Sequence, residues 1–355
     1  MQDSQPTGHR LGPIPMRGRK AVSGAQEQWV STFALQENQT IPLGIRPQVD
    51  GLDLVAWAST NRTYIEGLLH HYGALLFRGF LVNSIETFAQ FVQATAGDLY
   101  KYHERSSPRT EVGKNIYTST DYPQEYKIFL HNEHSYARDV PLKIYFYCDL
   151  PAQAGGETPI ADCRKVLLRI PEAVRERFRT KGWRYVRNFG EGFGLTWETA
   201  FQTTDKAEVE RYCQENYITS SWKSNGCLHT EQVRPALAIH PRTGETVWFN
   251  HATFFHVSTL PSAIGQALQA EISAHELPNN TYYGDGTPIE PEVLQLLREA
   301  YIQEEMTFTW EKGDILMLDN MLTAHARNAF QGPRRVLVGM ADIYRWFDGQ
   351  TEMAR

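Results

Sequence analysis

The chain has 355 residues, of which 41% are hydrophobic and 21% charged, and its formal net charge at pH 7 is −6. This composition is typical of a globular protein in water, and the mild acidity argues against a nucleic-acid partner or an anionic membrane surface. No apolar run approaches the roughly 20 residues of a membrane helix, so we expect no membrane association.

The cysteines indicate a reducing compartment. No two of them have a C-x-x-C spacing and none stands in a cluster with histidines, which argues against a disulfide framework or a structural zinc site. Dispersed, unpaired cysteines suit the cytoplasm, which is the predicted location. The cysteines are Cys148, Cys163, Cys213 and Cys227.

The first 30 residues are rich in glycine, proline and polar side chains. They lack the apolar segment of a signal peptide, so we predict a disordered arm over residues 1–30. The rest of the chain shows no internal repeat and no low-complexity linker. This favours a single domain over residues 31–355.

The first half of this region alternates between strand and helix signals. Residues 73–80, GALLFRGF, predict a short buried strand between glycines, and Ser84 can cap the helix that follows. A run of β-formers over 142–147 predicts another strand. Asp162 is placed to cap a helix, and Pro171 fits the first position of the next one.

The second half is richer in strands. The further elements we expect are a helix opening at Asp205 and Glu208, a hairpin over 237–250, helices over 262–275 and 291–304, and strands over 306–310, 315–318 and 336–344. Many short strands with inserted helices predict a mainly β (α+β) fold, namely a double-stranded β-helix or jelly roll with helical insertions. The sequence has no G-x-G-x-x-G after a strand and no P-loop, so nucleotide cofactors lose support.

The first candidate for chemistry is the segment LHNEHSY. His131 and Glu133 are two residues apart, so at the end of a strand both can face one metal ion. A distant third ligand, His325, would complete a set of two imidazoles and one carboxylate, which leaves coordination positions open as non-haem iron oxygenases require. The pair alone is weak evidence, because a rival pair stands at His229 and Glu231 and either can be a hydrogen-bonded strand feature.

The second half of the pattern lies in GDILMLDN, HARNAF and GPRRV. It places His325 just beyond one strand and an arginine pair at the start of the next, and adjacent antiparallel strands would turn both toward one cavity. A buried guanidinium suits the far carboxylate of a dicarboxylate. Arg334 and Arg335 alternate in direction, so only one should point inward; a hairpin with two solvated arginines is the alternative.

Taken together, these motifs resemble the taurine dioxygenase superfamily of Fe(II)/2-oxoglutarate-dependent oxygenases, in particular its syringomycin-type amino-acid hydroxylase-like branch. The likeness runs from about residue 73 to 344 and is carried by GALLFRGF, LHNEHSY, PAQAGGETPIADCR, GETVWFN and GDILMLDNMLTAHARNAFQGPRR. It implies an enzyme that uses Fe(II), 2-oxoglutarate as co-substrate and O2.

The resemblance also implies roles for individual residues. The residues that match the catalytic iron triad are His131, Glu133 and His325. Thr158 and Arg335 match the residues that hold 2-oxoglutarate, with Arg334 as the second choice. Most of the superfamily has aspartate where this chain has Glu133, and related halogenases have a small residue there, so the glutamate favours hydroxylation or desaturation over halogenation.

The resemblance limits the substrate only coarsely. The sulfonate-binding arginine of taurine dioxygenase would fall at Gly339, four residues after Arg335, so taurine is not expected. The branch suggests that the enzyme hydroxylates an unactivated C–H bond of an amino acid or a derivative, free or tethered to a carrier protein, in natural-product (antibiotic) biosynthesis. Desaturation and cyclisation remain alternatives, as do, from other classes, a zinc hydrolase and a non-catalytic binding barrel. The superfamily often forms oligomers, so a homo-oligomer is also expected.

Four further residues are candidates for contact with the substrate. Tyr117 and Ser119 precede the predicted metal-binding strand, Asn250 lies in the aromatic run WFNHATFFH, and His134 adjoins the triad. His134 would point to the opposite face of an ideal strand, which makes a structural role its main alternative. For the others, the alternative is plain packing or satisfaction of backbone groups.

Overall fold

The structure, a computed structural model, describes residues 29–37, 39–100, 104, 109–119, 122–190 and 194–347. The arm predicted over residues 1–30 lies outside the described residues except for its last two, and the first strand begins at Val30. None of the helices described within these ranges is long and apolar enough to cross a membrane.

Two sets of mainly antiparallel strands face each other and form the core. The larger sheet has the order β1-β2-β3-β16-β7-β19-β5-β4, in which only β2 and β3 pair in parallel. Its strands are β1 (Val30–Ala34), β2 (Leu43–Pro47), β3 (Ala74–Phe77), β4 (Glu111–Gly113), β5 (Ile116–Thr118), β7 (Asp139–Leu150), β16 (Ile315–Asp319) and β19 (Arg335–Arg345). The smaller sheets are β6 (Ile128–His131), β17 (Thr323–Arg327) and β9 (Ile160–Asp162), and β8 (Ala154–Gly155) with β18 (Phe330–Gln331). This arrangement confirms the predicted jelly roll.

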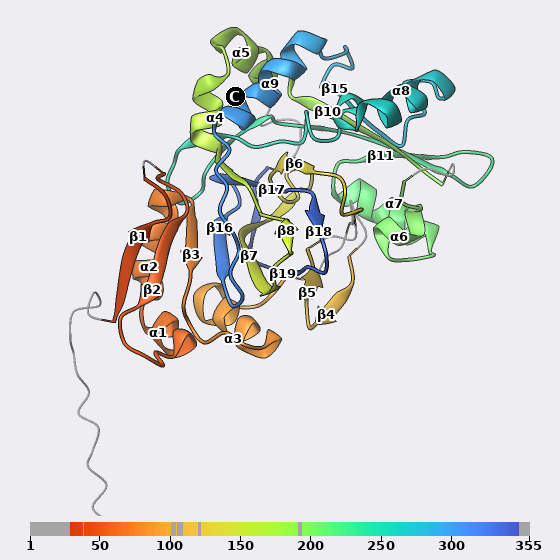
Figure 1. Cartoon of the computed structure of the whole chain (residues 1–355). Helices are drawn as coiled ribbons and strands as arrows, with labels where there is room; N and C mark the ends of the chain where they lie inside the picture. The colour runs from red at the N-terminus through yellow and green to blue at the C-terminus, as the bar shows by residue number, and fades with distance from the viewer. Residues whose placement is uncertain are drawn as a thin grey trace, which may run out of the picture.

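Strict alternation along the strands gives the larger sheet two apolar faces. In β7, for example, Tyr145 and Tyr147 pack on one face, whereas Ile144 and Phe146 pack on the other. The first face is covered by α1 (Leu54–Thr60), α2 (Arg62–Tyr72) and α3 (Ile85–Ala96), as Figure 1 shows. The second face looks into the jelly roll toward the smaller sheets, and this interior holds the site described below.

The remaining elements extend the core at one end (Figure 1). A four-stranded sheet consists of β10 (Trp183–Phe189), β11 (Thr219–Trp222), β12 (Leu228–Arg234) and β15 (Asn279–Tyr283), and a hairpin of β13 (Leu237–Ile239) and β14 (Thr246–Trp248). The helices are α4 (Cys163–Arg169), α5 (Glu172–Lys181), α6 (Trp197–Phe201), α7 (Lys206–Glu215), the 3-10 helix η2 (Val257–Thr259), α8 (Ser262–Glu271) and α9 (Pro291–Gln303).

The capping signals located the helix starts well. Ser84 accepts a hydrogen bond from the Thr87 amide at 3.1 Å, and Asp162 accepts one from the Arg164 amide at 2.9 Å. Pro171 is displaced by one position, since it is the N-cap residue of α5 and not its first residue. The strand predicted over 306–310 is wrong: apart from one isolated bridge between Met306 and Ile160, this run inserts its aromatic side chains into the core without pairing as a strand.

Candidate active site

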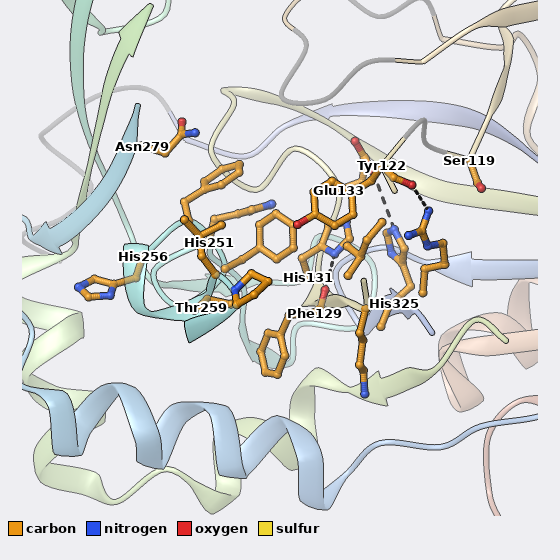
Figure 2. Close-up of a pocket in the computed structure, with 18 of the residues that line it drawn as sticks. Ser119, Tyr122, Phe129, His131, Glu133, His251, His256, Thr259, Asn279 and His325 are labelled. Carbon is orange, nitrogen blue, oxygen red and sulfur yellow. Dashed lines mark hydrogen bonds and ion pairs between the residues drawn. The ribbon is translucent and has the colours of Figure 1, made fainter. Parts of the chain in front are cut away.

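The predicted metal-binding residues meet inside the jelly roll. His131 ends β6 and stands directly opposite His325 of β17 in the register of the two strands, with their ring centroids 4.5 Å apart. Glu133 follows in the turn after β6, and its Oε2 lies 3.9 Å from His325 Nε2. One ligand atom from each of these residues lies within 4.8 Å of the other two, as required for a shared ion. Figure 2 shows the three side chains grouped in the cavity.

The turn that carries Glu133 is held by a buried asparagine that follows β16. Asn320, just after β16, accepts a hydrogen bond from the Glu133 amide at 2.8 Å and donates to the Glu133 carbonyl at 2.8 Å and to the Pro141 carbonyl at 2.9 Å. Its own carbonyl accepts from Asn132 Nδ2 at 2.6 Å. Glu133 is therefore positioned by the core and not by its own loop.

We expect Asn320→Ala to lower the free energy of unfolding by about 3 kcal/mol, because it leaves three buried backbone groups without their partner. Chemical denaturation in urea measures this change. Asn216→Ala is the matched control, since within the described part of the chain the side chain of Asn216 donates one hydrogen bond, to the carbonyl of Tyr212, and we expect a loss of about 1 kcal/mol. An Asn320→Ala protein as stable as the control would contradict this account of the turn.

The electrostatics of the three residues favour a cation. Burial alone would raise the pKa of Glu133, but Arg109 and the neighbouring histidines outweigh it and hold this pKa well below its usual range. Burial lowers the pKa of His131 and of His325, so both imidazoles are neutral near pH 7. His131 Nδ1 lies 2.9 Å from the Phe129 carbonyl, which leaves Nε2 for a metal. Two neutral imidazoles and one ionised carboxylate fit Fe(II).

The arginine pair is oriented opposite to the preferred prediction. Arg334 lines the cavity, where its Nε donates to the Gly156 carbonyl at 2.8 Å and its Nη1 to Ser119 Oγ at 3.2 Å. Arg335 is 58% exposed and pairs with Asp149 on the outside. The physical reason is the alternation of β19, in which Val336 faces inward and Arg335 outward; Arg334, just before the strand begins, continues this alternation and faces inward.

The alternative choice, Arg334, is thus the arginine in position to bind an anion. Burial, and secondarily Arg327, lowers the pKa of Arg334 to about 10, so the guanidinium remains charged at neutral pH. Gly156 has a φ of +73°, and a Cβ there would come within 2.9 Å of Arg334 Cδ, so this close approach requires glycine. Four residues after Arg334 stands Val338, which, like Gly339, cannot bind a sulfonate.

The other predicted residues divide into those inside and those outside the cavity. Thr158 and Ser119 line it, and Thr158 Oγ1 accepts a hydrogen bond from Trp310 Nε1 at 3.2 Å. Tyr117 packs in the apolar interior. Asn250 bridges Ala236 and Ala252 through its side chain and has a structural role.

Two other candidate histidines, His134 and His229, do not line the cavity. His134 has a φ of 58° and is buried among aromatic rings, including that of Tyr136 at 5.5 Å, and its Nε2 lies 3.7 Å from Glu133 Oε1, behind the metal-binding residues. The rival His229 lies in β12, where its Nε2 is 3.1 Å from Glu231 Oε1 and its Nδ1 is 2.8 Å from Asn188 Oδ1. This pair is the hydrogen-bonded strand feature that was its alternative interpretation.

Sequence reasoning missed two polar residues in the cavity. Arg109 Nη2 donates to Glu133 Oε2 at 2.9 Å, and no local motif marks this arginine. His251 lies next to Asn250 and hydrogen-bonds Ser135 through Nδ1; its ring centroid is 5.8 Å from that of His131. Burial, reinforced by His131, holds the pKa of His251 well below its usual value. The aromatic run WFNHATFFH was the available signal, but Asn250 was chosen from it as the cavity residue in place of His251.

The cavity has a volume of about 270 Å³. Phe254 stacks on His131 at 4.3 Å and, with Phe146, forms an apolar wall beside the metal-binding residues. Another wall includes Tyr122 and Lys127. The side chain of Arg327 holds this segment by donating to the backbone carbonyls of Tyr122, Pro123 and Tyr126 at 2.6–2.9 Å. The far end is lined by apolar side chains of residues 254–278, from η2 to the start of β15.

Comparison with known proteins agrees with this site. A family model described as Taurine catabolism dioxygenase TauD, TfdA family matches residues 34–341. The dapdiamide synthesis protein DdaC of Enterobacter agglomerans is 41% identical over 309 residues, which cover 84% of this chain and 94% of DdaC. A clavaminate synthase-like protein of Arabidopsis thaliana is 30% identical over 323 residues, which cover 86% of this chain and 94% of the relative.

Among solved structures, PvcB of Pseudomonas aeruginosa, described as an Fe, alpha-ketoglutarate dependent oxygenase from an isonitrile synthetic pathway, has a similar fold. The TM-score is 0.51 at 16% identity, and 94% of each chain is covered. Fold and family model together define a jelly-roll oxidoreductase of the iron- and 2-oxoglutarate-dependent dioxygenases. The chain belongs to the TauD, TfdA family within this class, which confirms the resemblance seen in its motifs.

Proposed function

We propose that His131, Glu133 and His325 hold the Fe(II), that Arg334 and Thr158 hold 2-oxoglutarate, and that the enzyme hydroxylates an unactivated C–H bond of an amino acid or an amino-acid derivative. The observation that carries the assignment is the convergence of the three ligand atoms within 4.8 Å in the cavity that Arg334 also lines. When bound, Fe(II) with 2-oxoglutarate and O2 supplies the oxidising power for C–H cleavage.

The protein's own residues supply position and environment. The contact of His131 Nδ1 with the Phe129 carbonyl fixes the ring, and Arg109 keeps Glu133 ionised and oriented. Arg334 presents a charged guanidinium to the far carboxylate of 2-oxoglutarate, with Thr158 beside it. Phe146 and Phe254 limit water beside the reacting C–H bond, and His251 offers a neutral ring that can hydrogen-bond a polar group of the substrate.

The substrate class is supported by the relatives. The name of DdaC places that protein in dapdiamide synthesis, and the similarity of 41% supports a role for this chain in natural-product biosynthesis. We therefore propose an amino-acid-derived substrate, either free or presented on a carrier protein, a cytoplasmic location, and a single catalytic domain that can form a homo-oligomer. Desaturation or cyclisation would use the same residues.

Two functions from other classes of protein explain fewer of the residues in this site. A zinc hydrolase could use the histidines and the glutamate, but it would give Arg334 and Thr158 no ligand to bind. A non-catalytic binding barrel would have no need to gather three metal-binding side chains and keep Glu133 ionised.

The test is a product assay. The Fe(II)-loaded protein is supplied with 2-oxoglutarate and ¹⁸O₂ and with a panel of amino acids and acylated amino acids, each free and as a carrier-protein thioester. We expect substrate-dependent succinate, and a product that gains one labelled oxygen atom. A product that only loses two hydrogen atoms would indicate desaturation or ring closure. Hydrolytic turnover with Zn(II) and without 2-oxoglutarate would contradict the proposal.

A further inference from the structure

The open end of the cavity carries an arginine that no role described so far explains. Arg298 of α9 is half-buried, and its Nη1 donates to Ser258 Oγ at 3.1 Å and to Thr259 Oγ1 at 3.2 Å. His256, Thr259 and Leu260 line the cavity, and Ser258 and Leu260 are exposed to solvent. In Figure 2, His256 and Thr259 lie on the side of the cavity away from Ser119. Arg298 is not itself a lining residue, but through its contact with Thr259 it stands at this exposed edge of the cavity, here called the mouth, on the side away from Ser119.

The partners of Arg298 are unusual for a half-buried arginine in this chain. The half-buried Arg78, Arg164 and Arg184 each form an ion pair with a carboxylate, whereas the fully buried Arg234 and Arg327 donate to carbonyl oxygens. Arg298 contacts two neutral hydroxyl groups and forms no ion pair with any acidic side chain in the described ranges. Taking a cation partly out of water without a counter-charge costs free energy, and a bound anion would offset this cost.

Arg334 shows the same pattern at the other end of the cavity. It contacts a hydroxyl group and a backbone carbonyl, forms no ion pair with a carboxylate among the residues that the structure describes, and is the residue proposed to receive the carboxylate of 2-oxoglutarate. Burial, and next the nearby Arg298, lowers the pKa of His256 to about 4, so this histidine is neutral at pH 7 and Arg298 supplies the charge at the mouth. Between the mouth and the metal-binding residues the wall is apolar, with Val257, Leu268 and Leu277.

We propose that Arg298, Ser258 and Thr259 form an anion-binding site at the cavity mouth, which takes a phosphate or carboxylate group at the end of the substrate that lies farthest from the metal-binding residues. The substrate is then an elongated molecule: its reactive C–H bond enters the cavity, an uncharged segment lies along the apolar wall, and an anionic group remains at the mouth. This inference rests on the proposed function, since it takes the cavity to be the place of oxidation.

The experiment compares 1-hexanol, hexanoate and hexyl phosphate by isothermal titration calorimetry. The protein is loaded with Mn(II) and N-oxalylglycine, which occupy the metal and co-substrate sites. We expect at least one anion to bind at least tenfold more tightly than 1-hexanol to the wild type. Hexyl phosphate as the preferred anion would indicate a phosphate-bearing substrate, and hexanoate a carboxylate-bearing one. Arg298→Gln should remove the preference, and Arg298→Lys should restore part of it.

Arg242→Gln is the matched control, because it removes one positive charge from an exposed turn of the β13–β14 hairpin. It should keep the full preference for the anion. Equal binding of the three compounds to the wild type, or a preference that survives in Arg298→Gln, would overturn the proposal. If the protein fails to take up Mn(II) and N-oxalylglycine, the proposed function fails. The same titration of the metal-free protein then still measures whether anion binding depends on Arg298. A urea denaturation curve for each variant confirms that it is folded.

Discussion

Replacing Glu133 with alanine is expected to abolish the Fe(II) and 2-oxoglutarate complex and to lower turnover at least about 1000-fold. The three candidate ligands lie within 4.8 Å of one another, and Glu133 is the only carboxylate among them. Its loss leaves two neutral imidazoles and removes the negative charge that offsets the cation. The measurement is the weak visible charge-transfer band that appears when the anaerobic apo-protein receives Fe(II) and then 2-oxoglutarate. His325→Ala should lose this band as well.

The chain supplies its own control for this experiment. His229 and Glu231 have the same spacing as His131 and Glu133, but they lie in β12 and bond to each other and to Asn188. The His229→Ala protein should therefore keep the band and most of the activity. A Glu133→Ala protein that still forms the band, with its iron content measured, would refute the assignment of this ligand.

The second large effect is expected at Arg334. Arg334→Ala should raise the KM for 2-oxoglutarate about 100-fold, which corresponds to about 2.7 kcal/mol, because it removes a buried charged partner of the distal carboxylate. Steady-state kinetics with varied 2-oxoglutarate at saturating Fe(II) measure this change. The cost falls on binding, so high concentrations of 2-oxoglutarate should recover part of the rate.

Arg335→Ala provides the matched comparison. This neighbour is 58% exposed and pairs with Asp149 outside the cavity, so we expect its removal to change the KM for 2-oxoglutarate less than twofold and stability by less than about 1 kcal/mol. The motif resemblance favoured the opposite result. If Arg335→Ala weakens 2-oxoglutarate binding and Arg334→Ala does not, the placement of the co-substrate in this cavity is wrong.

Local signals in the sequence predicted most of the helix starts and central strands. The caps Ser84, Asp162 and Asp205 marked helix starts because a short polar side chain satisfies free amides in the first turn, wherever the helix lies. The β-rich runs 142–147 and 315–318 became central strands of the larger sheet. The run 306–310 failed because apolar composition reports burial, and burial does not require strand pairing.

Part of the site depended on geometry that spacing does not encode. The residues His131 and His325 were found by motif, although Glu133 reaches them from a turn held by Asn320 and not from a strand. His325 and Arg334 were expected on adjacent strands, but β17 and β19 belong to different sheets. They meet across the interior of the jelly roll. Which of the two arginines faces inward could therefore be decided only once the structure showed which side of β19 faces the interior.

Residues without a motif were not predictable in this way. Arg109 enters the cavity from a segment far from both ligand motifs, and only the tertiary structure brings it to Glu133. His251 was hidden by its neighbour Asn250, because both are polar residues in one aromatic run and only the backbone direction decides which of them faces inward.

The hydrogen bonds of Arg327 allow a side chain in one wall of the cavity to change. This arginine, two positions beyond His325, supports the segment 122–126 through three carbonyl oxygens, which every amino acid possesses, and its guanidinium also lies over the ring of Tyr122 at 5.8 Å. The side chain of Tyr122, which lines the cavity, can therefore be exchanged for another aromatic side chain while the path of the wall is preserved. Mutational drift, or an aromatic library, at this position can alter substrate range without disturbing the strand that carries His325, so new specificities can evolve in this wall at little cost to the metal site.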